Sequence, residues 1–571
     1  MNDVTEKFTL QSKQFGALPI VDHFLERLDL SNLLKNTIDC NGNSHKIKPY
    51  DCLLLIVMNL IDGRRPLYEL REWTVEFSPQ TLPIGADQIE YLNDDRIGRA
   101  LDKLFCANRA SLQTNIVLQA IREFCINVDQ LHNDSTSITF TGKYKEANGN
   151  PMHGKKTLLI TNGFNKDHRP DLKQILWILT VTADGAIPLH YSACDGNTTD
   201  DTTHVKTWDT LCNLLGRKDF IYVADSKLCV SKTMKHIAGN DGFFITVVPA
   251  TRKEEQDFRD YLVTHKIQWN EEWEKEKSRS TRKQKKIEKW RVVESPLPSA
   301  EGFRIIWVWN STKEKSDQER RRNLIKNAHK SFDQLEERLQ NNRCRIRTMG
   351  GVERAADKII DDMSAGRWVT YKIDEESERI IRQVGKGRPG PNTQYVSETK
   401  SHFHVSCHID EDLVQDDGYS DGMFPLITNH KHLGCRDVLE KYKYQPRLEK
   451  RHEQLKTVYD VAPMWLNSVA RIEAFLFLYF VALLVQSLIE RAIRQSMKKN
   501  GLESIPIYPE SRECYSPTTD RILGIFENLH YHDLIGNGSI VQTFQPRLNR
   551  IQEQVLELLD IPMEVYQKNH L

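Results

Sequence analysis

The sequence carries no excess of charge of either sign. Its 571 residues include 79 lysines and arginines and 79 aspartates and glutamates, so the formal net charge is zero. A chain without a basic excess can bind nucleic acid only through a local patch. The length is also too great for a single hydrophobic core, and we expect roughly two to four domains.

Cysteine pairs are missing as well. The eleven cysteines occur singly, and none forms a Cys-x-x-Cys pair. This pattern indicates thiols in a reducing compartment rather than a disulfide framework. The first residues, MNDVTEKFTLQSKQ, lack a basic segment followed by an apolar run, so we expect no signal peptide.

The sequence also lacks an apolar run long enough for a membrane span. The best candidate, AFLFLYFVALLVQSLI, has an uninterrupted apolar run of eleven residues, 475–485, whereas a span needs roughly 20. Charged residues, including Arg471 and Glu490, close this run at both ends. We therefore predict a fully buried core helix and no association with a membrane.

Helical patterns occupy the N-terminal part of the chain. IVDHFLERLDLSNLL, PYDCLLLIVMNLI and DDRIGRALDKLF each repeat apolar residues at three- and four-residue spacing. The pattern changes to that of strands from residue 132, and helices return from residue 437. The regions we expect are a helical N-terminal domain (1–125), the first part of an α/β core (126–250), a β-rich and charged insertion (251–430), core-closing helices (431–500) and a helical C-terminal region (501–571).

Strands and helices alternate within the expected α/β core. HNDSTSITF, residues 132–140, alternates polar and apolar side chains as a half-buried strand does. Asp184-Gly185 between two apolar runs is a hairpin signal. The apolar run DFIYVADS, residues 219–226, precedes a helical stretch that Gly239 ends and then a further strand. This order predicts a mixed α/β layer arrangement.

Carboxylates mark two strands of this predicted sheet. Asp134 lies at the start of one strand and Asp225 at the end of another. An unpaired carboxylate near a core is costly unless a cation meets it, so Asp134 is either a turn cap or a metal ligand. The segment 442–456 offers further partners, because four of its polar residues share an arc about 60° wide on an ideal helix. These residues are Tyr442, Gln445, Glu449 and Lys456.

The same residues resemble the Tyr-x2-Arg-x3-Glu-x6-Lys signature of bacterial insertion-sequence transposases of the DDE class, which have an RNase H-like catalytic fold. Tyr442, Glu449 and Lys456 fall on this signature. DSTSITFTGKY is similar to the first-aspartate strand of the family, RPDLKQILWILTV to its following strand, and YVADS to its second-aspartate strand. GNTTDD resembles the motif between them, and NDDRIGRALDKL and GRRPLYELREW resemble the helical N-terminal domain of one branch. The likeness runs from about residue 14 to about residue 495.

The resemblance implies an α/β protein with an RNase H-like mixed-sheet catalytic core, a helical N-terminal DNA-binding or dimerisation domain, and a β-rich insertion between the second Asp and the Glu. It implies a cut-and-paste transposase that binds the terminal inverted repeats of an insertion sequence, cleaves DNA and transfers the strands through hairpin ends. Asp134 would bridge two Mg²⁺ or Mn²⁺ ions, and Asp225 and Glu449 would each complete one ion. We therefore expect double-stranded DNA as a partner, a homodimer in the DNA complex, and a cytoplasmic, nucleoid-associated bacterial protein.

A basic run in the predicted insertion is a second candidate DNA contact. Residues 275–291 contain nine Lys or Arg and two Glu. Clustered cations beside aromatic side chains suit phosphate contacts and base stacking, although a solvated surface would carry the same charges. The candidates are Arg282, Lys283, Lys285 and Lys286 for phosphates, together with Tyr442, Gln445 and Lys456, and Trp290, Trp307 and Trp309 for a flipped base, with core packing as the alternative for each Trp.

Two positions depart from the family signature. Gln445 stands where the family has Arg, and its lack of charge weakens the expected phosphate contact. Pro446 follows directly, and proline is best tolerated in the first turn of a helix. The helix that carries Glu449 is therefore predicted to begin near residue 446.

Two rival interpretations remain open at this point. One is a DNA-binding transposition regulator or element relic that has lost catalysis. The other is a zinc site, because imidazole and thiolate ligands suit zinc and several such residues cluster within a short stretch. They are His402, His404, Cys407, His408, His430, His432 and Cys435.

Overall fold

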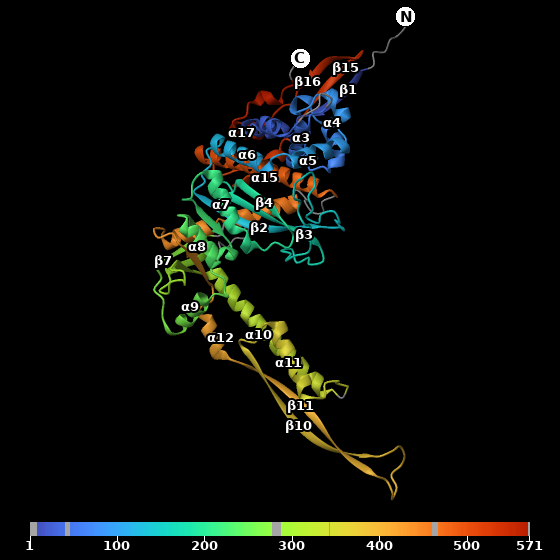
Figure 1. The fold of residues 1–571 in the computed structure, drawn as a ribbon, viewed down its shortest axis with the longest axis vertical. Coiled ribbons are helices and arrows are strands. Elements are labelled where there is room, and N and C mark those ends of the chain that lie inside the picture. The colour runs from blue at the N-terminus through green and yellow to red at the C-terminus, as the bar shows by residue number, and fades with distance from the viewer. Residues whose placement is uncertain (1–7, 40–45, 277–286, 342, 459–465, 569–571) are drawn as a thin grey trace. The chain divides into compact units, whose positions relative to one another are not determined.

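The computed structural model describes residues 8–39, 46–276, 287–341, 343–458 and 466–568. It is an α/β protein with a large mixed sheet, as the sequence predicts. The chain forms two compact units (Figure 1). Unit 1 consists of Met1–Thr246 and Glu440–Leu571, and unit 2 consists of Val247–Leu439.

The N-terminal helices of unit 1 surround one long apolar helix from the far end of the chain. Helix α15 (Val469–Lys499) is long and apolar enough to cross a membrane, but its most apolar window is completely buried inside the protein. It packs on α3, α5 and α17 and on β4, and a helix that is apolar on all sides needs such burial. The helices predicted as a separate domain, 1–125, thus share a core with α15. They are α1 (Leu18–Arg27), α2 (Leu30–Thr37), α3 (Pro49–Ile61), α4 (Leu70–Glu76), α5 (Asp94–Cys106) and α6 (Arg109–Glu123).

The strands of unit 1 form a mixed sheet in the order β4-β3-β2-β5-β6. β2, β3 and β4 are antiparallel neighbours, whereas β5 and β6 run parallel to β2. The turn between β3 and β4 contains Gly185 at φ +85°, which explains the Asp-Gly hairpin signal. The elements are β2 (Gln130–Phe140), β3 (Lys173–Thr182), β4 (Pro188–Cys194), β5 (Ile221–Ala224) and β6 (Phe243–Val247), with helices α7 (His204–Leu215), α8 (Ser231–Gly239) and α14 (Gln445–Glu453).

The C-terminal region, expected to be helical, also contains strands. β1 (Phe8–Gln14) pairs antiparallel with β15 (His530–Gly536), which in turn pairs with β16 (Ser539–Phe544). Asn537 and Gly538, both with positive φ, form the turn of this hairpin. The Asn-Gly pair is a strong hairpin signal that the helical expectation overlooked. The other elements are β13 (Ile505–Tyr508), β14 (Arg512–Cys514), α16 (Thr519–Gly524) and α17 (Arg550–Leu559).

Unit 2, which covers the predicted insertion, combines strands with a long pair of helices. Four strands have the order β12-β9-β8-β7, and two more form a separate hairpin. The helix of 30 residues, α10, was not anticipated in a region expected to be β-rich. The elements are α9 (Lys253–Thr264), β7 (Glu271–Glu276), β8 (Ile287–Glu294), β9 (Arg304–Asn310), α10 (Ser311–Gln340), α11 (Met349–Met363), β10 (Val369–Gln383), β11 (Tyr395–Ile409), α12 (Glu411–Gly418), β12 (Met423–Thr428) and α13 (Cys435–Tyr442).

The separate hairpin of unit 2, β10 with β11, is packed at its base and bare at its end. Near the base, Val369, Phe403 and Val405 are buried against Phe332 of α10 and Val352 of α11. Beyond the base, from residue 374 to residue 399, nearly all side chains are exposed. We call residues 376–402 the arm, and it extends from the helices as a two-stranded ribbon (Figure 1).

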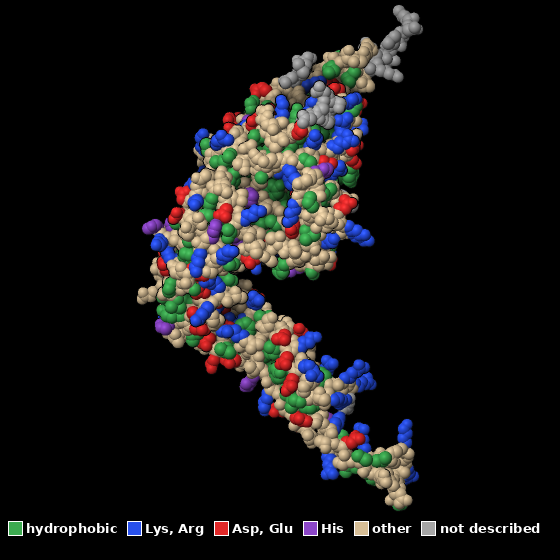
Figure 2. Space-filling view, in the orientation of Figure 1, with side chains coloured by type: hydrophobic (Ala, Val, Ile, Leu, Met, Phe, Trp, Pro, Cys, Tyr) green, Lys and Arg blue, Asp and Glu red, His purple; other side chains and the backbone are tan. Residues whose placement is uncertain are grey.

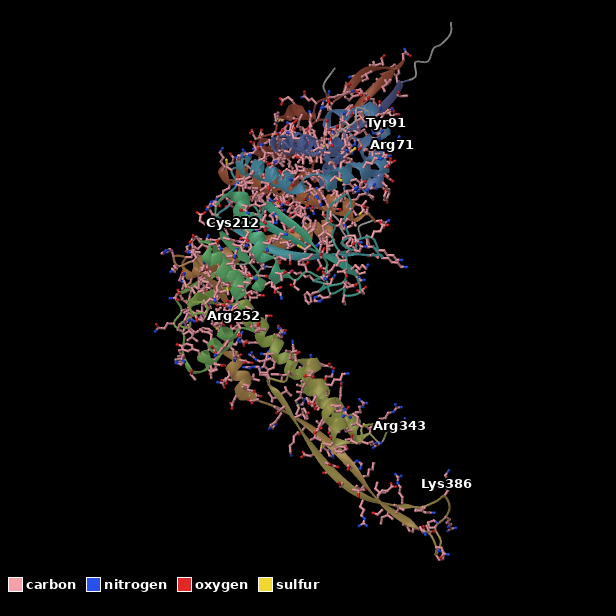
Figure 3. All side chains as sticks on the ribbon, in the orientation of Figure 1. Arg71, Tyr91, Cys212, Arg252, Arg343 and Lys386 are labelled. Carbon is pink, nitrogen blue, oxygen red and sulfur yellow. The ribbon has the colours of Figure 1, made fainter. Side chains whose placement is uncertain are left out.

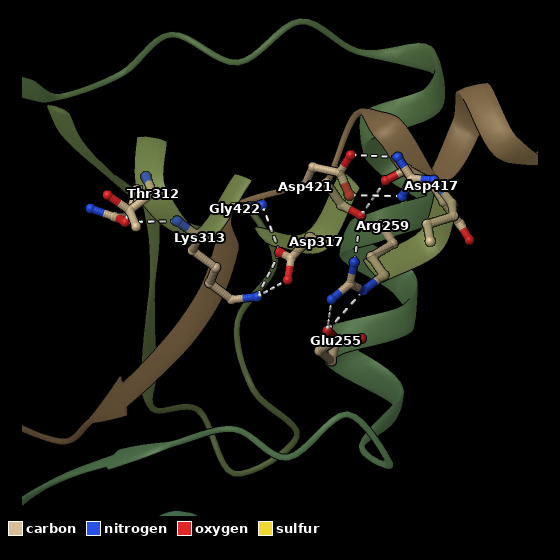
Figure 4. A network of polar contacts seen from close by, with 11 residues as sticks. Glu255, Arg259, Thr312, Lys313, Asp317, Asp417, Asp421 and Gly422 are labelled. Carbon is tan, nitrogen blue, oxygen red and sulfur yellow. Dashed lines mark hydrogen bonds and ion pairs between the residues drawn. The ribbon is translucent and has the colours of Figure 1, made fainter. Parts of the chain in front are cut away.

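A network of ion pairs joins the helices of unit 2 to the segment before β12. Arg321 of α10 forms a two-pronged pair with Asp421 at 2.8 and 2.5 Å. Asp317 accepts hydrogen bonds from Lys313 at 2.6 Å and from the Gly422 N–H at 2.9 Å (Figure 4). Bidentate Arg–carboxylate pairs hold geometry better than single contacts. The network therefore fixes α10 against the strand layer of unit 2.

Candidate active site

Asp134 and Asp225 occupy neighbouring positions in the sheet of unit 1. β2 and β5 run parallel, and their last paired residues are Asn133 and Ala224. Asp134 and Asp225 come next in this register. Neighbouring strands lie about 4.8 Å apart, and side chains in register point to the same face of the sheet. The two aspartates are therefore adjacent, although 91 positions separate them in the sequence.

Burial and repulsion from a neighbouring carboxylate disfavour the negative charge of both aspartates. Burial raises the pKa of the Asp134 carboxyl, and the nearby Lys166 ammonium opposes this rise only in part. Burial also raises the pKa of Asp225, and the charge of Asp134 adds to the rise. Each carboxylate accepts one backbone hydrogen bond, from Ser135 N at 2.7 Å and from Lys227 N at 3.0 Å. Such a pair favours the presence of a cation.

Helix α14, which carries Glu449, is docked onto the strand of Asp134. Gln445 in its first turn is buried and donates a hydrogen bond to the Asn133 carbonyl at 3.2 Å. Its carbonyl oxygen lies 2.8 Å from Nδ1 of His132. These contacts occupy the Gln445 amide inside the protein, so the predicted DNA contact at this residue is not supported by its position. Gln445 instead positions Glu449, which is exposed one turn further along the helix.

The stripe of four residues predicted for one helix is divided among three segments. Tyr442 is the last residue of α13, α14 begins at Gln445, and Lys456 lies in the π-helical segment η6 (Gln454–Val458). Pro446 lies in the first turn of α14, as expected, and proline disfavours helix in the residue before it. This break explains why the face calculated for one continuous helix does not form.

The Tyr442 hydroxyl nevertheless lies in the field of all three candidate carboxylates. Burial raises the pKa of Tyr442 to about 12, and the charges of Asp225, Glu449 and Asp134 each contribute to the rise. Carboxylates from two strands and one helix thus all lie within electrostatic range of this phenol. The phenol remains protonated at neutral pH and can donate a hydrogen bond.

Two residues that the sequence analysis did not select join this cluster, Lys166 from a loop and Asp200 from the short 3-10 helix η4 (Asp200–Thr202). The Lys166 Nζ lies 2.7 Å from both the carbonyl and the hydroxyl oxygen of Ser135, 3.0 Å from Asp200 Oδ2 and 3.6 Å from Asp134 Oδ1. Burial opposes the charge of Lys166, but Asp134 and Asp200 outweigh it and raise the pKa of the ammonium. One lysine therefore supplies the cation of the cluster. Asp200 belongs to GNTTDD, which was its only sequence signal.

His452 is a further residue of the site that the sequence analysis missed. Its side chain is buried, and neither ring nitrogen has a hydrogen-bond partner. Nε2 lies 3.8 Å from Oδ2 of Asp134. Burial lowers the pKa of His452 to about 3, and Lys166 and Lys456 lower it further, so the ring is neutral. The spacing of three residues from Glu449 places both on one face of α14, which is the signal that could have identified it.

Lys456, a predicted DNA contact, is held by a loop carboxylate. Its Nζ lies 2.6 and 2.7 Å from the two carboxylate oxygens of Asp167. Asp167 directly follows Lys166, the cation of the cluster. One dipeptide thus contacts both the acidic and the basic side of the site.

The donor set of the cluster suits a hard divalent ion. Mg²⁺ prefers oxygen ligands and is usually held by few carboxylates together with phosphate oxygens. Within the residues that the structure describes, no three Asp, Glu, His or Cys side chains converge closely enough to hold a metal ion. Carboxylates repel one another unless a cation lies among them, and the Lys166 ammonium occupies such a place.

Two of the three tryptophans proposed to receive a flipped base belong to the core of unit 2. Trp307 is 1% exposed and stacks on Phe258, with ring centroids 3.9 Å apart. Trp290 is also buried. Trp309 is partly exposed, and the Arg291 guanidinium lies over its ring at 4.6 Å. Core packing therefore accounts for Trp290 and Trp307, and only Trp309 retains an accessible face.

The structure describes the basic run, residues 275–291, only in part. Arg282, Lys283, Lys285 and Lys286 lie outside the residues that the structure describes. At its described end, Lys289 pairs with Glu274 at 3.0 Å and Arg291 pairs with Glu272 at 3.1 Å across the β7–β8 pair. These two cations are therefore already matched by carboxylates.

The candidate zinc ligands pair with carboxylates or lie apart. His404 lies 2.9 Å from Glu336 of α10, and His402 lies 3.5 Å from Glu378 of the neighbouring strand. His402, His404, Cys407 and His408 all belong to β11, whereas His430, His432 and Cys435 follow β12. In the described ranges these residues form no group of three that could hold a metal ion.

A family model for a domain of unknown function, DUF4277, matches residues 10–118. No curated protein matches the chain significantly. One similar solved structure is the piggyBac transposase synaptic complex with hairpin DNA, which is 8% identical, with coverage of 89% of this chain and 78% of that chain and a TM-score of 0.37. A likeness of this degree assigns no function to this chain.

Proposed function

We propose that this chain is a DDE transposase with an RNase H-like core, which cleaves the ends of an insertion sequence and transfers them to target DNA. The observation that best supports this is the register of β2 and β5, which makes Asp134 and Asp225 neighbours. Glu449, on a helix docked to β2, adds the third carboxylate. The mixed strand order of unit 1 accords with the RNase H-like class that the sequence motifs suggest.

The proposed metal ligands are Asp134, Asp225 and Glu449. Two divalent ions, when bound, would supply Lewis-acid activation of a water or a 3′-hydroxyl and stabilisation of the leaving 3′-oxygen. The protein's own part is to hold the carboxylates. The backbone N–H groups of Ser135 and Lys227 orient the two aspartates, and Gln445 fixes the helix of Glu449.

The remaining polar groups of the site would act on DNA or on the carboxylates. Tyr442 keeps its proton and can donate it in a hydrogen bond to a phosphate oxygen. Lys456 would contact a phosphate once it separates from Asp167, since a lysine serves as a compact positive charge for phosphate. The neutral, buried His452 ring faces Asp134, with Nε2 3.8 Å from Oδ2, and can accept or donate a hydrogen bond there.

The alternative is a regulator or element relic that binds DNA without cleaving it. The two functions are separated by a nicking assay with end-labelled DNA that carries the terminal inverted repeats flanking the gene. The proposed transposase nicks at the repeat end in Mg²⁺ or Mn²⁺ and not in EDTA. Binding without nicking in either metal would contradict the proposal and favour the regulator.

A homodimer on paired DNA ends and hairpin intermediates belong to the same proposal. Hairpins can be detected in the nicking reaction, because a hairpin end migrates on a denaturing gel as one strand of double length. Sedimentation of the protein with and without the repeat DNA gives the number of chains per complex. Nicked ends that never form hairpins would limit the proposal to simple strand cleavage.

A further inference from the structure

The Lys166 ammonium is surrounded by oxygen atoms in an arrangement that resembles a cation-binding site. Four oxygen atoms lie within 3.6 Å of its Nζ, two from Ser135 and one each from Asp200 and Asp134. Carbonyl, hydroxyl and carboxylate oxygens are the ligand types that Mg²⁺ and Mn²⁺ prefer. A second, independent observation is the buried His452 ring, whose unpartnered Nε2 faces Asp134.

The next residue has the opposite charge and makes the complementary contact. Asp167 pairs with Lys456, the lysine proposed to contact a DNA phosphate. The Lys166–Asp167 dipeptide therefore places a positive charge among the carboxylates and a negative charge on the phosphate-binding lysine. A bound metal ion would likewise place a positive charge among the carboxylates, and a DNA phosphate would place a negative charge on Lys456.

We propose that Lys166 and Asp167 are tethered substitutes for the metal ion and the DNA phosphate. Asp200 and Ser135 join Asp134 as oxygen ligands of a cation site that Lys166 fills and that a divalent ion takes over. Asp167 then releases Lys456 to a phosphate. The assignment rests on the proposed function, to which it adds Asp200 as a ligand and a competition between lysine and metal.

The test measures Mn²⁺ binding by the full chain, from the signal of free Mn²⁺ in electron paramagnetic resonance. Lys166→Met removes the competing charge and should bind Mn²⁺ at least about tenfold more tightly than the wild type, because like charges a few ångströms apart repel strongly. Lys166→Arg keeps the charge and should bind like the wild type. Lys156→Met, at an exposed lysine of the same loop, is the matched control. Equal or weaker binding by Lys166→Met would overturn the competition.

Asp200 and Asp167 have separate tests. Asp200→Asn should weaken Mn²⁺ binding at least about tenfold, as loss of a charged ligand does, and unchanged binding would remove it from the site. Asp167→Asn should raise the affinity for the repeat DNA in EDTA more than Asp171→Asn, which removes the same charge from an exposed position of the same loop. Equal effects of the two variants would remove Asp167 from the proposal. Absence of Mn²⁺ binding by the wild type would instead contradict the proposed function itself.

The end of the arm carries a second feature that does not depend on the metal site. Residues 379–400 include five basic residues and one acidic residue. Arg382 lies 3.7 Å from Glu398, whereas Lys386 and Arg388 have no carboxylate partner among the residues that the structure describes. Figure 2 shows Lys and Arg side chains along this part of the arm, and Lys386 lies at its free end in Figure 3. The five are Arg379, Arg382, Lys386, Arg388 and Lys400.

The turn of the arm is unusually slim. Gly385 and Gly387 have positive φ and flank Lys386, and Pro389 follows Arg388. A Cβ placed on either glycine meets no atom within 4 Å, so there is open space where a side chain would stand. The minor groove of DNA is about 6 Å wide, and its narrow A·T-rich stretches attract Lys and Arg. A basic turn without bulky side chains fits such a groove.

We infer that the tip of the arm binds the minor groove of A·T-rich duplex DNA through Lys386 and Arg388. The full chain is titrated with A·T-rich and G·C-rich duplexes of equal length at several salt concentrations. The double change Lys386→Gln with Arg388→Gln should abolish the preference for A·T. It should also reduce the slope of log affinity against log salt by roughly two units, since each cation that contacts a phosphate contributes about 0.9. Lys358→Gln with Lys372→Gln, which removes two exposed lysines near the base of the hairpin, should leave the preference intact.

Two results would overturn this inference. One is an unchanged preference and salt slope in the tip variant. The other is a change in the number of associated chains during sedimentation without any change in DNA binding, which would make the tip a protein–protein contact.

Discussion

The carboxylate cluster of unit 1 and the arm of unit 2 use charge in opposite ways. In the cluster, Asp134, Asp225 and Lys166 are partly buried, and the ionisation of each responds to other charges of the cluster. At the end of the arm, Lys386 and Arg388 are exposed and unpaired within the described residues. Neighbouring charges in one network respond non-additively to substitution, whereas separate exposed charges act independently. Loss of any one charge should therefore abolish the activity of the cluster, whereas each charge removed from the arm should weaken DNA binding by a separate step.

The largest effect is expected from removing any one carboxylate of the cluster. Asp134→Asn, Asp225→Asn and Glu449→Gln should each reduce strand cleavage in Mg²⁺ by at least about a thousandfold, because residues that act as a unit lose most activity when one is removed. Binding to the repeat DNA should persist in a band-shift assay. Near-normal cleavage by one variant would remove that residue from the set.

The next effect contrasts the base of the hairpin with the arm. Phe332→Ala should lower the free energy of unfolding by about 3–5 kcal/mol, because this ring is buried at the base between α10, α11 and the hairpin. Replacement of residues 376–402 by a short Asn-Gly turn should change the thermal midpoint little, since almost all side chains removed are exposed. Denaturation of the two variants tests this. A large loss of stability in the shortened variant would mean that the arm is packed in solution.

The salt dependence of DNA binding should change with the basic run. Replacement of Arg282, Lys283, Lys285 and Lys286 by Gln should reduce the slope of log affinity against log salt by roughly two to four units if most of them contact phosphates. Mn²⁺ binding should be unaffected, since the cluster is elsewhere in the chain. An unchanged slope would identify the run as a solvated surface.

The smallest effect concerns pH. Because the pKa of Asp134 and of Asp225 is raised in the folded protein, the folded state binds their protons more strongly than the unfolded state does. In the absence of metal, stability should therefore fall as pH rises above the usual aspartate value of about 4. Asp134→Asn should flatten this fall. Burial raises the pKa of Asp22 to about 7, so Asp22 causes a loss of stability of the same sign outside the cluster. Asp22→Asn should also flatten the fall of stability with pH and serves as the positive control.

Local patterns predicted much of unit 1. Alternation identified the strand of Asp134, the Asp-Gly pair identified the hairpin, and the apolar run identified the buried helix α15. Strand ends selected Asp134 and Asp225, the resemblance assigned Glu449 as their partner, and the strand register places the two aspartates side by side. These features depend on short-range periodicity or on motifs, both of which a single sequence contains.

Contacts between distant segments were not predictable in the same way. Lys166 and Asp200 enter the cluster from segments without periodicity, and only the fold brings them to Asp134. Gln445 was predicted to contact DNA, but its side chain is buried and its hydrogen-bond partners lie within the protein. The C-terminal strands were not predicted, although Asn537-Gly538 is a hairpin signal. Their pairing partner β1 is at the other end of the chain, and a local pattern does not show this contact.

The central claim is that Asp134, Asp225 and Glu449 form one metal-binding set, and counting bound Mn²⁺ tests it most directly. The full chain with repeat DNA, titrated with Mn²⁺ and followed by electron paramagnetic resonance, should bind about two ions per chain, as a two-metal site requires. Asp134→Asn, at the proposed bridging ligand, should abolish both, and Asp225→Asn and Glu449→Gln should each abolish at least one. Binding that none of the three substitutions alters, or no binding at all by the wild type, would contradict the account.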